Sequence, residues 1–132
     1  MNLAQANVVE LAPNAVRTST LTGTAVDTRA LDGVAQVVLV SSAATAGTDP
    51  TLDVKLTHCD TSGGSYTDVT GATFAQVTDA ADSTQMIAVK TGELKRYVKV
   101  VGTIGGTSTP TFGFGVVLVG CNHAGRNSSQ SV

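Results

Sequence analysis

The chain has 132 residues, which suits one domain that can bury a core without disulfides or a metal. Only 14% of the residues are charged and the net charge is −2, so the sequence lacks the basic footprint of a nucleic-acid-binding protein. Val, Ala, Thr and Gly dominate and 4% of residues are aromatic, a composition that favours pleated sheets over helices. No apolar run approaches the roughly 18 residues of a membrane span, so we expect no membrane contact.

The N-terminal residues 1–17 are predicted to form an extended arm outside the folded domain. The stretch MNLAQANVVELAP lacks the basic start of a secretion signal, and Pro13 disfavours a helix. Ordering such a segment costs about 1–2 kcal/mol of backbone entropy per residue, which contacts with a partner would have to offset. We therefore expect a chain without residues 2–12 to keep its fold and to lose binding. The expected docking side chains of the arm are Leu3, Val8, Val9 and Leu11.

The next segment, residues 18–120, is predicted to be an all-β domain with turn signals about every 8–12 residues. This spacing is typical of a jelly-roll-like β-sandwich or barrel of about eight strands. The expected strands cover residues 18–28, 34–42, 51–58, 65–70, 71–78, 83–90, 95–104 and 111–120. A polar tail, residues 121–132, follows and is expected to dock on a neighbour as well.

Three of these strands carry patterns that predict burial. In TLDVKLTH, Leu52, Val54 and Leu56 share one face, while Asp53, Lys55 and Thr57 share the other. In the last strand, one face is predicted to lie in the core. VAQVVLVSS, residues 34–42, is apolar on both faces, so it is either a central strand or a strand with one face against a partner. The predicted core face of the last strand consists of Phe112, Phe114, Val116 and Leu118.

Four residues are formally a Cys2His2 set of metal ligands: His58, Cys59, Cys121 and His123. A structural zinc site needs ligand pairs separated by two or more residues, and adjacent strand residues point to opposite faces. We therefore expect no metal, two surface histidines and two free thiols, although sequence leaves a disulfide open.

Catalytic patterns are also weak, so we expect no enzyme and no cofactor. The sequence has no G-x-S-x-G motif and no phosphate-binding loop. Its carboxylates fall mainly in turns or on solvent faces, and no Trp is present to stack a sugar ring. The basic cluster Lys90, Lys95, Arg96 and Lys99 is either a solvated strand face or a surface for an acidic partner. The carboxylates are Asp53, Asp60, Asp68, Asp79 and Asp82.

The order of the motifs resembles a family of small proteins encoded in the head-gene region of tailed bacteriophages and prophages. The resemblance covers about residues 22–120. It consists of a TLDVKL strand, a Gly-containing turn, an aromatic-Thr-Asp-Val strand in SYTDV, and RYVKV before the last strand.

This resemblance implies a head decoration protein, also called a cement or auxiliary capsid protein, with a jelly-roll-like fold. It implies a trimer on the virion surface that binds the major capsid protein and braces the shell, after synthesis in the host cytoplasm. Docking would then involve Lys95, Arg96 and Lys99 together with the arm. The alternatives are a phage head–tail connector or tail component, and a carbohydrate-binding module that would need Tyr66 and Tyr97 as exposed platforms.

Overall fold

Nearly every apolar–polar alternation of the sequence forms a strand in the computed structural model, which describes residues 6–122. Eight strands are linked by hydrogen bonds, and no α-helix occurs among the described residues. The all-β, jelly-roll-like prediction is therefore confirmed. In chain order the elements are β1 (Ala6–Arg17), β2 (Leu21–Thr22), β3 (Val26–Asp27), β4 (Leu31–Ser41), β5 (Ala46–Cys59), β6 (Thr67–Thr73), β7 (Ser83–Lys90), the 3₁₀ turn η2 (Thr91–Glu93) and β8 (Tyr97–Asn122).

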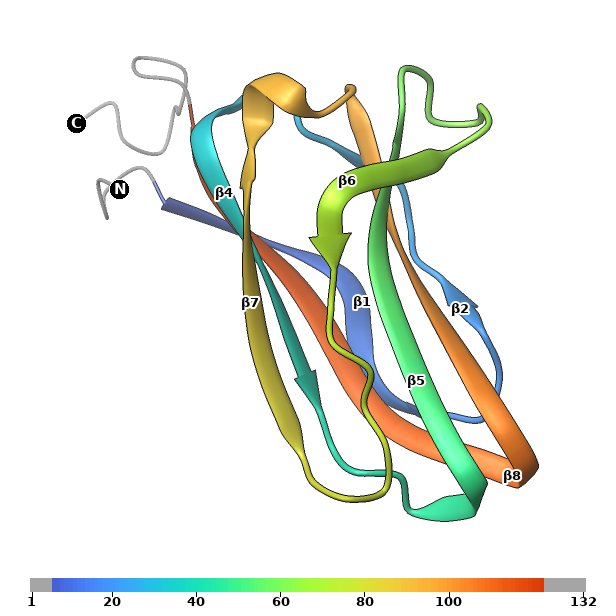
Figure 1. Cartoon of the computed structure of the whole chain (residues 1–132). Coiled ribbons are helices and arrows are strands. Elements are labelled where there is room, and N and C mark those ends of the chain that lie inside the picture. The colour runs from blue at the N-terminus through green and yellow to red at the C-terminus, as the bar shows by residue number, and fades with distance from the viewer. Residues whose placement is uncertain (1–5, 123–132) are drawn as a thin grey trace.

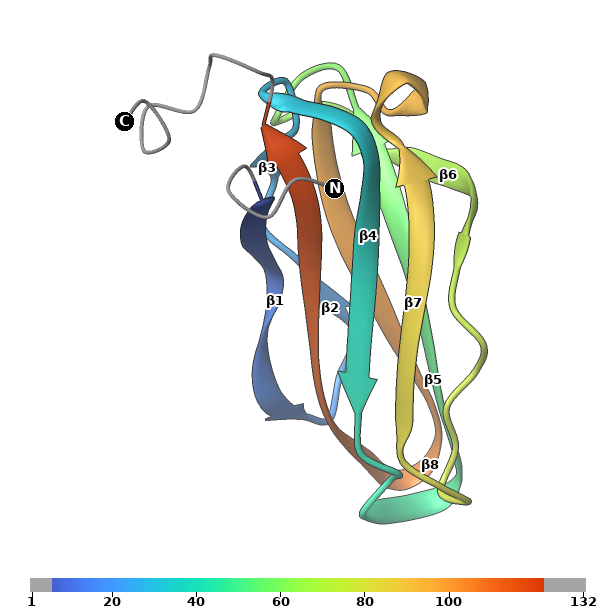
Figure 2. The same ribbon diagram turned by 90° about the vertical axis from the view of Figure 1, so that its left-hand side faces the viewer.

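Two layers arise because the 26-residue strand β8 passes through both of them. Its first part pairs with β5, β2 and β3, and its last part pairs with β4 and β1. The chain turns between these parts near Gly106, whose φ of 112° suits glycine. We call the layer β1–β8–β4–β7 sheet A and the layer of β2 and β3, β8, β5 and β6 sheet B. Figure 1 shows the two layers, and Figure 2 shows sheet A face on.

The core lies between the two sheets, where the predicted alternation places it. The face of β8 that was predicted to be buried has 0% exposure at all four positions, Phe112, Phe114, Val116 and Leu118. From sheet B, Leu52, Val54 and Leu56 pack into the same cluster. A methyl group at Gly102 would lie 2.9 Å from the Phe114 ring, so this glycine makes room for the aromatic side chain.

The N-terminal segment differs from the prediction, because residues 6–17 form strand β1 of sheet A rather than an arm. β1 pairs antiparallel with β8 from Ala6–Cys121 to Arg17–Phe112. Leu11 is 1% exposed and belongs to the core of this chain, so it is not a docking residue. Deleting residues 2–12 would remove the first part of this strand together with the buried Leu11 and Ala12, so we expect the truncated domain to be destabilised.

Two register shifts in β1, between Glu10 and Ala12 and between Ala12 and Ala15, explain why its sequence does not alternate. The Arg17 guanidinium donates to the Phe114 carbonyl at 2.7 Å and to the Pro13 carbonyl, which holds the bulged segment. At the other end of the chain, the first two residues of the predicted tail belong to β8. Leu3 and residues 123–132 lie outside the described part.

Candidate docking surfaces

The face of sheet A that points away from the core is apolar and almost free of charge. All five large apolar side chains that are exposed among residues 6–122 belong to its strands β1, β4 and β7. Side chains alternate between the two faces of a strand, and these residues occupy the positions that do not point into the core. They are Val8 at 64%, Val16 at 74%, Val34 at 49%, Val40 at 54% and Met86 at 62% exposure.

Strand pairing joins these side chains into one continuous surface. One row crosses the whole sheet, because Glu10 pairs with Val117, Val117 with Val38, and Val38 with Met86. A groove of about 290 Å³ runs along the surface beside Gly115, between β1 and β4. We call this surface the outer face of sheet A. It comprises Val8, Glu10, Asn14 and Val16 of β1, Val34, Gln36, Val38 and Val40 of β4, Thr84, Met86, Ala88 and Lys90 of β7, and Val117 and Val119 of β8.

The opposite surface, on sheet B, is polar and pairs its groups internally. Lys55 contacts Asp68 at 2.8 Å, and Gln76 donates to both carboxylate oxygens of Asp53 at 3.1 Å. These interactions occupy charged and amide groups that a partner would otherwise have to desolvate. The two faces of the molecule therefore differ in chemistry, and sheet A carries the better docking surface.

The predicted basic cluster is not brought together as one free patch. Arg96 pairs with Asp27 at 3.0 Å, and its hydrogen bond to that carboxylate lowers the pKa of Asp27. Lys99 lies over the Tyr66 ring at 4.5 Å, on sheet B. Lys90 ends β7 in sheet A, whereas Lys95 precedes β8 and is exposed.

The residues considered for a metal site are separated by the fold. Cys59 ends β5 in sheet B, and Cys121 lies near the end of β8 in sheet A; both are free thiols. His58 Nδ1 accepts a hydrogen bond from the Lys95 backbone N–H at 3.2 Å. Burial, and secondarily the charge of Lys95, lower the pKa of His58. In the described chain no three His, Cys, Asp or Glu residues gather as metal ligands, and His123 lies outside it.

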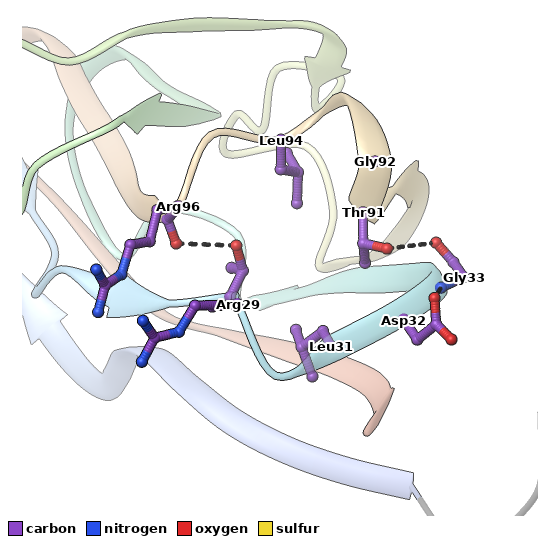
Figure 3. A pocket seen from close by; sticks show the side chains of 9 residues that line it. Arg29, Leu31, Asp32, Gly33, Thr91, Gly92, Leu94 and Arg96 are labelled. Atoms are coloured by element: carbon purple, nitrogen blue, oxygen red, sulfur yellow. Dashed lines mark hydrogen bonds between the residues drawn. The ribbon is translucent and has the colours of Figure 1, made fainter. Parts of the chain in front are cut away.

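A depression of about 500 Å³ lies where β4 begins, beside η2 (Figure 3). Its polar groups bind one another: Thr91 Oγ1 donates to the Gly33 carbonyl at 2.8 Å, and the Gly33 N–H donates to Asp32 at 2.9 Å. Its lining contains one carboxylate, Asp32, and no histidine, cysteine or lysine, so this depression lacks an acid–base pair. Between residues 6 and 122, no helix is both long and apolar enough to cross a membrane.

No protein-family model and no curated protein matches the sequence. Solved structures of viral particles do match. The structure of infectious bursal disease virus, Gx strain, is 14% identical with a TM-score of 0.60, and the match covers 95% of this chain and 33% of that one. The VP2 subviral particle of the same virus is 12% identical with a TM-score of 0.57, covering 95% and 34%. The chain thus spans about a third of the length of these proteins, and at such identities the likeness shows a shared fold.

Proposed function

We propose that this chain is a structural, non-enzymatic protein of a viral particle, and that it decorates and stabilises the capsid of a tailed bacteriophage as a trimer. The observation that carries the proposal is the outer face of sheet A, which collects the five large exposed apolar side chains. An apolar face of this kind marks an interaction surface. The fold that presents it is shared with proteins of a viral particle.

Decoration suits this chemistry because a brace needs contact area rather than a reactive group. Burying an exposed Val or Met side chain contributes about 1.5–3 kcal/mol. Few charges on this face would have to be desolvated, and repeated copies on a shell would add through avidity. Among the residues predicted to dock, Val8 lies on this face, and Lys95 and Lys99 remain proposed contacts of the polar side.

The carbohydrate-binding alternative is disfavoured by the two tyrosines. A sugar platform needs an open ring face, but Arg96 lies over Tyr97 at 4.9 Å and Lys99 lies over Tyr66 at 4.5 Å. Both side chains are also half-buried. A head–tail connector or tail component would use the same apolar face and is separated from decoration by experiment.

The test is co-sedimentation of the purified protein with expanded capsids of the phage that encodes it, prepared without this protein. We expect saturable binding in a fixed ratio to the major capsid protein and higher resistance of the shells to heat. Val40→Lys, with a charge on the outer face of sheet A, should bind less tightly than the matched variant Thr103→Lys, with the same charge on sheet B. Absence of binding to shells, with the protein found instead in isolated tails, would contradict decoration and favour the tail-component alternative.

A further inference from the structure

The edges of sheet A are protected, although its outer face is not. The edge strand β1 contains Pro13 and two register shifts, and both features oppose the addition of another strand. At the other edge, the Gln85 side chain of β7 bonds the Ala75 backbone, accepting from N–H at 2.8 Å and donating to the carbonyl at 2.9 Å. We therefore expect a partner of this sheet to pack on the face rather than extend the sheet.

The size of the outer face suits a moderate protein–protein interface. Four strands at about 4.8 Å spacing are about 19 Å wide, and a strand as long as β7 extends about 26 Å at about 3.3 Å per residue. The product is about 500 Å² on each partner, hence about 1,000 Å² in total, the lower range for a specific interface.

The few charges on this face have opposite signs on opposite sides. Glu10 lies on the edge strand β1, and Lys90 lies at the end of the other edge strand, β7. A third charged residue, Asp32, borders this face at the start of β4 and accepts a hydrogen bond from the Gly33 N–H. When two copies are related by rotation about an axis parallel to the strands, the β1 side of one meets the β7 side of the next. The acidic side of one copy then lies opposite the basic side of the next, with Glu10 at the height of Met86 and Lys90 four residues further along β7, so like charges do not meet.

We infer that the outer face of sheet A binds a second copy of this chain, with the β1 half of one copy packed on the β7 half of the next. The inference deepens the proposed function, on which its role in a particle rests. Rotation about an axis parallel to the strands leaves the position of each residue along the strand direction unchanged. Val8 and Ala88 share one level through Val119 and Gln36, so Val8 of one copy faces Ala88 of the next.

The first test measures the oligomeric state of the full chain by light scattering across a concentration series. We expect a dimer or trimer for the natural protein, and a dissociation constant at least about tenfold higher for Val40→Lys, because the interface would bury an unpaired charge. Thr84→Lys serves as a second variant on a different strand, β7, and circular dichroism verifies that each variant is folded. Thr103→Lys adds the same charge to the outer face of sheet B and should leave the dissociation constant unchanged. A natural protein that stays monomeric at high micromolar concentration would overturn the inference, as would equal weakening by Thr103→Lys.

The second test addresses orientation, in a background where Cys59→Ser and Cys121→Ser remove the native thiols. Val8→Cys and Ala88→Cys chains, mixed and treated with a short bifunctional maleimide that spans about 10 Å, should form the mixed cross-link in large excess over the cross-link of either chain alone. If Val8→Cys chains cross-link among themselves as readily, the proposed orientation is wrong. Both tests use the protein without capsids, so they can fail while co-sedimentation succeeds, and the reverse. A trimer would also support the decoration proposal, whereas a dimer would support the surface and contradict the trimer.

Discussion

Replacing Leu11 by alanine should destabilise the folded protein, whereas replacing Val8, three residues earlier on the same strand, should not. Leu11 is 1% exposed within the core, and truncating such a leucine costs about 2–5 kcal/mol, depending on how far the cavity collapses. Val8 is 64% exposed, so its truncation should change the free energy of unfolding by less than about 0.5 kcal/mol. The pair separates a core strand from a docking arm, because an arm would give the same small effect at both positions.

Urea unfolding followed by circular dichroism gives both free energies. The measurements belong in the Val40→Lys background, since self-association stabilises the folded state and would add a contribution from Val8 contacts between copies. We expect a lower midpoint with an unchanged slope for Leu11→Ala, and a curve close to the parent for Val8→Ala. Equal midpoints for the two variants, with particle binding lost in both, would refute the assignment of β1 to the core and restore the arm hypothesis.

Three further predictions concern packing and titration. Gly102→Ala should cost about 1–3 kcal/mol by crowding the Phe114 ring, and a double-mutant cycle with Phe114→Leu should show that the smaller side chain recovers part of this loss. The lowered pKa of His58 means that the folded state binds fewer protons than the unfolded state, so stability should fall as the pH drops below about 6.5, and His58→Gln should flatten that dependence in pH-resolved unfolding. The lowered pKa of Asp27, due first to its hydrogen bond with Arg96, contributes stability above about pH 4 that is lost in acid; Asp27→Asn should reduce the acid slope of the unfolding free energy, and an unchanged slope would contradict this contribution.

Sequence predicted the fold best where one rule, strict alternation, decides the structure. Residues 112–118 and 51–58 alternate, and their inward faces are in the core. Alternation gives the direction of a side chain and not what covers it: Thr57 was expected on the outward face, yet it is 5% exposed and donates to the Lys99 carbonyl at 2.9 Å. The strand predicted over residues 18–28 exists only as the short β2 and β3.

Strand β1 was missed because its bulges break the alternation, and because Pro13 is compatible with an edge strand only once the neighbours are known. The N-terminal strand pairs with residues about a hundred positions later, which no local pattern reveals. For the same reason, the sequence predicted only part of the docking surface. Residues 34–42 were expected to be either central or partner-facing, and β4 is central while Val34 and Val40 are exposed. Only pairing with β1 and β7 shows that these side chains form one surface.

The two candidate docking surfaces respond to salt in opposite ways, and this separates them. Contacts made by Lys95 and Lys99 with an acidic shell would be screened, because the Debye length falls from about 10 Å at 0.1 M salt to about 3 Å at 1 M. Contacts made by the outer face of sheet A are mainly apolar and carry little electrostatic energy to lose. Self-association should therefore persist from 0.1 M to 1 M sodium chloride in the light-scattering series. If capsid binding weakens at least tenfold over the same range while self-association does not, the shell contacts the polar side and the copies contact one another through sheet A. If both are insensitive to salt, the shell also contacts an apolar surface, and this would contradict an outer face of sheet A that is wholly covered by other copies. A self-association that vanished in high salt would mean that charged groups, rather than the valines, hold the copies together, and would contradict the inference.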